Sequence, residues 1–225
     1  MNTKATFYPK GAFSLIDLLL LIGTMGLLAA VLVPVLTKPK MHVCRINCVN
    51  NLKQVGLSFR LWAGDNGDKF PMQVSTRSGG SMEQVTDGLV APHFQLMSNE
   101  LATPKILICP QQSKRVAATN FASLQETNLS YFVVPEADES LPQLWLTGDR
   151  NLATNRKALK PGLATVTPNT ALGWTAEPHQ HNGNLTLSDG SVQQFSNARL
   201  PAFLSATFTA YSGATSNTTF RILLP

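Results

Sequence analysis

Hydrophobic and polar residues are distributed unevenly along the chain. From Leu18 to Leu36 there is no charged residue. Counted from Leu15, the apolar run has about 22 residues, or roughly 33 Å as a helix, which is enough to cross a bilayer core of about 30 Å. A secretory signal would have a shorter apolar run, of about 7–15 residues. The pattern predicts a transmembrane helix over residues 13–36, after a basic leader over residues 1–12 that favours a cytoplasmic N-terminus.

A second helical pattern follows the apolar run. Pro34 and Pro39 interrupt the path, because proline removes a backbone donor and bends a helix. Beyond them, apolar residues recur at three- and four-residue spacing, which predicts an amphipathic extension over residues 37–63. The stripe consists of Val43, Ile46, Val49, Leu52, Val55, Phe59 and Trp62. The turn-forming residues 64–68 are expected to end the helix.

The remaining residues, 64–225, alternate loops with short apolar segments and predict a globular domain with an antiparallel sheet. The expected strands are 106–109, 131–134, 144–147, 170–174, 185–187 and 192–195. The last two are joined by Asp189 and Gly190, which predict a two-residue type I′ hairpin. The region 199–208 is a further helix candidate, and 212–219 is expected to be a loop. The predicted fold class is therefore α+β.

The charge and the cysteine content of the chain exclude only a few classes of function. The 18 basic and 13 acidic residues give a formal charge of +5, without the concentrated basic stripe that nucleic-acid binding requires. The pair Cys44 and Cys48 has no nearby histidine or cysteine set and is a poor zinc pattern. In an exported domain, Cys48 and Cys109 are the favoured disulfide pair, and free or buried thiols are the alternative.

The segment Lys10-Gly-Ala-Phe-Ser-Leu-Ile-Asp-Leu-Leu-Leu20 resembles the processing signal of type IV prepilins and type II secretion pseudopilins. In that family a dedicated peptidase cuts before an aromatic residue and methylates the new amine. The resemblance implies cleavage between Ala12 and Phe13, an acidic fifth mature residue at Asp17, and a helix-bending proline at Pro34. The family more often has Gly before the cut and Glu at the acidic position.

Further motifs resemble a group of pseudopilin-like proteins with a C-terminal H-x9-DG signature. They are Cys48-Val-Asn-Asn-Leu-Lys-Gln-Val-Gly-Leu57, Asp65-Asn-Gly-Asp-Lys-Phe-Pro71, Ile108-Cys-Pro110 and His179-x9-Asp189-Gly190. The resemblance implies a pilin-like fold, in which a long N-terminal helix packs on a small antiparallel sheet. It also implies a structural subunit of a pseudopilus or pilus-like filament. Its implied partners are a prepilin peptidase, other pilin subunits and the membrane, with an assembly ATPase and a platform protein acting indirectly.

The implied location is the bacterial inner membrane, with the C-terminal domain in the periplasm or in an extracytoplasmic filament. There, Asp17 would pair with the Phe13 amine of a neighbouring subunit, since an acid in an apolar helix tends to be paired or functional. The alternative is that Asp17 sits at headgroup depth. A different class of function is a monomeric, membrane-tethered domain that binds polysaccharide or another envelope ligand.

Candidate catalytic chemistry is weak in this sequence. It has no nucleophile elbow, HExxH pair or P-loop, so we expect no enzyme, no catalytic residues and no cofactor. Calcium at Asp189 is a minor candidate, by analogy with some major pseudopilins. The side chains that could form a catalytic or metal cluster are Trp174, His179, His181 and Asp189. A hydrolase using His179 and Asp189 is a third alternative, and packing histidines with a turn aspartate are the simpler interpretation.

Overall fold

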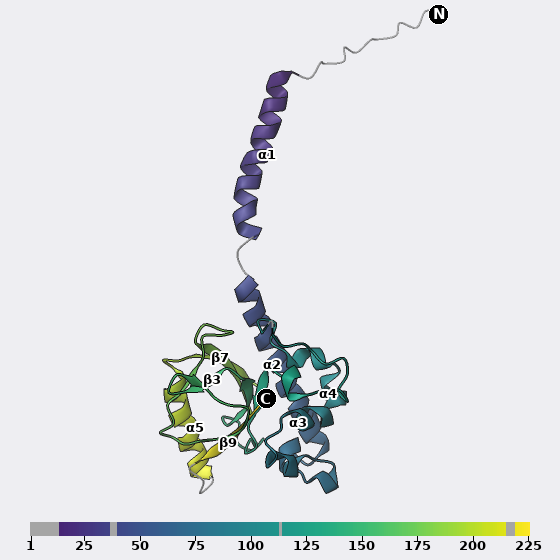
Figure 1. Cartoon of the computed structure of the whole chain (residues 1–225), viewed down its shortest axis with the longest axis vertical. Helices are drawn as coiled ribbons and strands as arrows, with labels where there is room; N and C mark the ends of the chain where they lie inside the picture. Colours follow the sequence, from purple (N-terminus) through teal and green to yellow (C-terminus); the bar gives the residue numbers. More distant parts are fainter. Residues whose placement is uncertain (1–13, 37–39, 113, 215–218) are drawn as a thin grey trace, which may run out of the picture. The chain divides into compact units, whose positions relative to one another are not determined.

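The computed structural model describes residues 14–36, 40–112, 114–214 and 219–225. The chain divides into two compact units, residues 1–40 and residues 41–225. Figure 1 traces the elements of both units along the sequence. The predicted leader and Phe13 lie outside the described residues.

In the first unit, residues 15–36 form the helix α1 (Leu15–Leu36). The apolar side chains of residues 15–31 are exposed, with Leu15 76% and Leu27 71% accessible. The helix continues through Pro34, and residues 37–39 after it are outside the described part of the chain. Within the described residues, no helix has the length and apolarity required of a membrane span.

The helix α2 (Lys40–Asp65) contains the predicted amphipathic pattern, and from Met41 onward it belongs to the second unit. Its buried face begins at Cys48 and continues through Leu52, Val55, Phe59 and Trp62. The prediction that Ile46 belongs to this face is wrong, because its side chain is 57% exposed. The buried stripe starts half a turn later, where the small Cys48 side chain meets the rest of the domain.

A six-stranded sheet with the order β5-β9-β1-β2-β7-β8 forms the centre of the second unit. Every neighbouring pair in it is antiparallel. Its strands are β1 (Tyr131–Val133), β2 (Trp145–Asp149), β5 (Gly162–Val166), β7 (Asn182–Leu187), β8 (Val192–Ser196) and β9 (Phe220–Leu224). A smaller sheet has the order β4-β3-β6. Its strands are β3 (Leu152–Thr154), β4 (Lys157–Ala158) and β6 (Leu172–Trp174).

Helices surround the sheets. The α-helices are α3 (Ala91–Leu96), α4 (Ser98–Leu101) and α5 (Leu200–Ala214). The 3-10 helices are η1 (Pro71–Gln73), η2 (Thr76–Ser78), η3 (Met82–Val85), η4 (Pro104–Leu107) and η5 (Glu126–Asn128). In Figure 1, α5 appears on one side of the strands, and α2, α3 and α4 appear on the other.

The strand predicted over residues 106–109 is wrong. Pro104 occupies the first turn of η4, and the Thr103 side chain accepts a hydrogen bond from the Lys105 amide. This short helical turn buries Leu107 fully, so the apolar residues are buried without pairing in a sheet. The prediction of an α+β domain with an antiparallel sheet is confirmed.

The helix α2 packs closely on the β7–β8 hairpin. A Cβ atom at Gly56 would lie 2.6 Å from the Thr186 Cγ2 atom of β7. Near the C-terminal end of α2, Arg60 Nη1 donates to the backbone oxygen of Asp189 over 3.2 Å. Between β2 and α5, the Trp145 indole stacks on Phe203 and donates a hydrogen bond from Nε1 to Thr207 Oγ1. These contacts connect both groups of helices to the central sheet.

Candidate functional site

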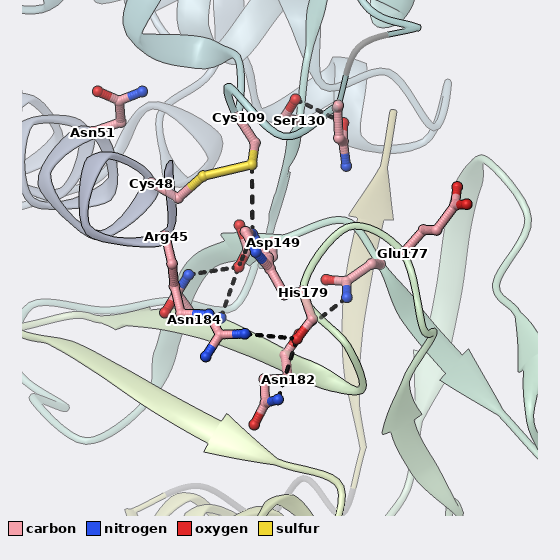
Figure 2. A network of polar contacts seen from close by, with 12 residues as sticks. Arg45, Cys48, Asn51, Cys109, Ser130, Asp149, Glu177, His179, Asn182 and Asn184 are labelled. Atoms are coloured by element: carbon pink, nitrogen blue, oxygen red, sulfur yellow. Dashed lines mark hydrogen bonds and ion pairs between the residues drawn. A yellow bond between two sulfur atoms is a disulfide. The ribbon is translucent and has the colours of Figure 1, made fainter. Parts of the chain in front are cut away.

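A buried cluster of sulfur, imidazole and carboxylate groups lies where α2 meets the sheet (Figure 2). Cys48 of α2 and Cys109, after η4, form a disulfide with a Cα–Cα distance of 5.4 Å. This is the pair favoured from the sequence. It connects residues 61 positions apart and so joins α2 directly to the chain segment that leads into β1.

His179 approaches the disulfide from the loop before β7. Its Nε2 atom lies 3.4 Å from Cys109 Sγ and 3.4 Å from Asp149 Oδ2. The backbone oxygen of His179 accepts hydrogen bonds from Arg45 Nη2 at 3.2 Å and from Asn182 Nδ2 at 3.1 Å. Both the side chain and the backbone of this residue are therefore held in place.

Asp149, the last residue of β2, is positioned by the neighbouring strand β7. Its Oδ2 atom accepts hydrogen bonds from both the backbone nitrogen and Nδ2 of Asn184, each at 2.8 Å. The carboxyl group is 2% exposed and the His179 ring is 0% exposed. Two donors of one residue, the backbone nitrogen and the side-chain amide of Asn184, therefore fix the carboxylate against the histidine.

Burial controls the ionisation of this pair. Burial raises the pKa of Asp149 to about 7, although the Asn184 donors and the Arg45 charge favour its ionised form. Burial, and then the nearby Arg45 charge, lowers the pKa of His179 to about 4. The imidazole is therefore uncharged at neutral pH, so its 3.4 Å contact with Asp149 is not an ion pair between two charged groups.

Several buried polar atoms of the cluster have no hydrogen-bond partner among the described residues. They are His179 Nδ1, Asp149 Oδ1, Asn184 Oδ1 and Arg45 Nε. A native core leaves few such atoms, and each one calls for an explanation. The three groups Cys48 Sγ, Cys109 Sγ and a His179 ring nitrogen also lie within 4.8 Å of one another, which is close enough to share a metal ion.

The two ends of the H-x9-DG motif do not meet. His179 precedes β7 and lies in the buried cluster, whereas Asp189 follows β7 in an exposed turn. Asp189 Oδ1 accepts a hydrogen bond from the Ser191 amide at 2.8 Å. A hydrolytic pair made of these two residues is therefore not assembled, and Asp189 is not among the residues that gather around His179.

The hairpin after β7 differs from the predicted type I′ turn. Leu187 pairs with Ser191, because the Leu187 amide donates to the Ser191 oxygen. The loop thus has the three residues Ser188, Asp189 and Gly190. Of the last two, only Gly190 has a positive φ, of 82°, which is typical of a type I turn followed by a glycine bulge.

Trp174 and His181 have structural contacts. His181 Nδ1 lies 3.1 Å from the Trp174 backbone oxygen. The Trp174 ring packs on Gly183, where a Cβ atom would lie 2.4 Å from the indole. Neither residue belongs to the Cys48–Cys109–His179 group.

The N-terminal candidates fall partly within the described chain. Ala12 and Phe13 lie outside it, and Pro34 is within α1. The Asp17 carboxylate accepts a hydrogen bond from the Ser14 amide at 3.2 Å, and Ser14 Oγ accepts one from the Ile16 amide at 3.4 Å. This reciprocal arrangement caps the first turn of α1, so Asp17 has a local role in addition to any role in assembly.

Sequence reasoning missed Asp149, Asn184 and Arg45. No motif surrounds Asp149, and an aspartate after glycine resembles a turn residue. The signal that could have found it is the strand pairing, which places β2 beside β7 and hence Asp149 beside Asn184. No family model, curated protein or solved structure matches this chain.

Proposed function

We propose that this chain is a prepilin-like structural subunit. In this proposal a prepilin peptidase removes residues 1–12 and methylates the amine of Phe13. Residues 13–36 then anchor the chain in the bacterial inner membrane, and residues 41–225 form a domain on the periplasmic side. The chain would assemble with other pilin or pseudopilin subunits, and an assembly ATPase and a platform protein would supply the energy. It would act without catalysing a reaction or binding nucleic acid.

The observation that supports this proposal best is the exposed apolar surface of α1. From residue 15 to residue 31 the helix presents large aliphatic side chains around its circumference, and they are exposed. The exposed residues of this kind are Leu15, Ile16, Leu18, Leu19, Leu20, Leu21, Ile22, Met25, Leu27, Leu28 and Val31. A helix that is apolar all round requires an apolar environment, which lipid supplies before assembly and neighbouring copies supply within a filament.

The position of Asp17 supports the same proposal. It is the single acidic residue of α1 and lies in the first turn, four residues after the proposed Phe13 amine. Pairing with that amine in a neighbouring subunit would offset the cost of placing a carboxylate in an apolar helix bundle. The Cys48–Cys109 disulfide also fits a domain that functions in an oxidising compartment.

The charge and the capping role of Asp17 can be separated in the native host. Asp17→Asn keeps a side-chain oxygen that can cap the helix but removes the charge, whereas Asp17→Glu keeps the charge. The proposal predicts that sheared surface or periplasmic filaments contain the wild-type and Glu variants but lack the Asn variant. Filaments that incorporate the Asn variant at the wild-type level would contradict the pairing with Phe13.

A second candidate function is a membrane-tethered monomer that binds an envelope ligand such as a polysaccharide. The observation that favours it is a cavity of about 540 Å³ lined by Arg115, Arg150, Gln111, Gln112 and Asn151, among others. Fractionation distinguishes the two functions. A protein found only as a membrane-bound monomer would favour the second candidate, whereas its presence in sheared fibres supports the first.

A further inference from the structure

We propose that the reduced chain binds one zinc ion at the buried cluster. The ligands are Cys48 Sγ, Cys109 Sγ, His179 Nε2 and Asp149 Oδ2. The disulfide and the metal are then alternative states of a single site, one under oxidising and the other under reducing conditions. This inference does not depend on the proposed pilin-like function.

The spacing of the ligand atoms supports this assignment. In a tetrahedral site with zinc bonds of about 2.3 Å to sulfur and about 2.0 Å to nitrogen and oxygen, sulfur and nitrogen are about 3.5 Å apart, and nitrogen and oxygen about 3.3 Å. Cys109 Sγ and His179 Nε2 are 3.4 Å apart, as are His179 Nε2 and Asp149 Oδ2. Two edges of a zinc tetrahedron are therefore already present.

The two sulfur atoms can form a third edge once they are no longer bonded to each other. The Cα atoms of Cys48 and Cys109 are 5.4 Å apart, so both thiolates remain within reach of one ion. The three groups Cys48, Cys109 and His179 lie within 4.8 Å of one another in the oxidised form. Two thiolates with an imidazole and one further ligand make a set typical of tetrahedral zinc.

The surroundings suit such a site. Asn184 holds the Asp149 carboxylate through two hydrogen bonds, as the outer partners of metal ligands commonly do. The Arg45 guanidinium donates to the His179 backbone and supplies one positive charge close by. Two thiolates and one carboxylate are neutralised by one zinc ion together with this arginine, which a buried site requires.

A route for the ion is provided by the cavity of about 540 Å³ described above. Its lining includes Gln111, two residues after Cys109, and Pro178, immediately before His179. A local movement of these two loop segments would therefore open the buried site from the cavity. The long-range packing of the domain need not change.

Conversion of the disulfide state into the zinc-bound state requires a reductant. A water-soluble phosphine breaks the Cys48–Cys109 bond, and the two sulfurs gain two electrons and two protons. The phosphine is oxidised to its oxide, with the oxygen taken from water. Zinc binding then displaces the two thiol protons to solvent and leaves the zinc oxidation state unchanged.

The test uses the full chain in detergent, with and without phosphine, and cobalt(II) as a spectroscopic substitute for zinc. The inference predicts one cobalt per reduced chain, with intense visible bands of tetrahedral geometry and a sulfur-to-cobalt charge-transfer band. Zinc should displace the cobalt and abolish the bands. The oxidised chain should bind no cobalt, and its far-ultraviolet circular dichroism should match that of the reduced, loaded chain.

Matched variants decide which thiols are involved. Cys48→Ser should lose at least half of the charge-transfer intensity, because one of the two thiolates is removed, whereas Cys44→Ser, one helical turn earlier, should keep the full spectrum. Asp149→Asn should keep the sulfur band but weaken cobalt binding at least tenfold. The inference is overturned if reduced wild-type protein binds no cobalt, whether it stays folded or unfolds. It is also overturned if Cys44→Ser weakens the band while Cys48→Ser leaves it at full intensity.

Discussion

Gly56 of α2 and Thr186 of β7 are in such close contact that no side chain fits between them. A Cβ atom at Gly56 would be 2.6 Å from Thr186 Cγ2 and 3.4 Å from the Gly190 backbone. The same helix carries Cys48, the first cysteine of the disulfide, two turns earlier. Glycine at position 56 is therefore a packing requirement of the domain.

Gly56→Ala should destabilise the domain by about 1–3 kcal/mol, because an added methyl group overpacks a filled interface. Helix propensity alone predicts instead that the substitution stabilises the domain, by up to about 1 kcal/mol. Gly64→Ala is the matched control, since it lies in the same helix with nothing within 4 Å of the added carbon. Urea denaturation monitored by tryptophan fluorescence measures both. Equal stability of the two variants would show that α2 does not pack on β7 as described.

His93 should make the domain sensitive to acid. Its ring is fully buried with Nδ1 2.6 Å from Ser81 Oγ, and burial lowers its pKa from 6.5 to about 4. Between these two values the unfolded chain binds a proton that the native chain does not. The free energy of unfolding should therefore fall, by up to about 3 kcal/mol, as the pH drops through this window.

His93→Gln isolates this effect from other titrating groups. The measurement is the free energy of unfolding of both proteins from pH 7 to pH 4. The difference between wild type and variant should shift by about 3 kcal/mol across that range, to the disadvantage of the wild type. Two curves that run parallel would show that His93 titrates equally in the folded and unfolded states.

The hairpin after β7 predicts unequal roles for Asp189 and Gly190. Gly190 has a φ of 82°, so Gly190→Ala should cost about 1–2 kcal/mol in backbone strain. Asp189→Ala should cost about 0.5–1.5 kcal/mol, the value of its hydrogen bond to the Ser191 amide. Thermal unfolding measures both. A larger loss for Asp189→Ala than for Gly190→Ala would contradict the three-residue turn.

The sequence predicted those parts of the fold that depend on local signals. Short apolar segments between loops located β1, β2, β6, β7 and β8, and the spacing on α2 identified its buried face from Leu52 onward. The errors arose where a sequence pattern is compatible with more than one local structure. The apolar run around Leu107 is buried by a helical turn that Pro104 begins, and the Asp-Gly turn uses three residues instead of two.

The candidate site was less predictable because it is made by long-range contacts. Cys48 and Cys109 were paired from the sequence, but nothing local connects them with Asp149, which comes from the end of another strand. His179 drew attention through its spacing to Asp189, yet its contacts are with Cys109 and Asp149. Strand order and helix packing bring these groups together, and neither is encoded in the residues next to them.

The proposed function depends on how the N-terminus is processed. The decisive measurement is mass spectrometry of the intact protein purified from its native host through a C-terminal tag, with sequencing of its N-terminal peptide. The account predicts a mature chain that begins at Phe13 and carries one methyl group on its amine. A chain that retains residues 1–12, or one that has lost α1 altogether, would contradict it.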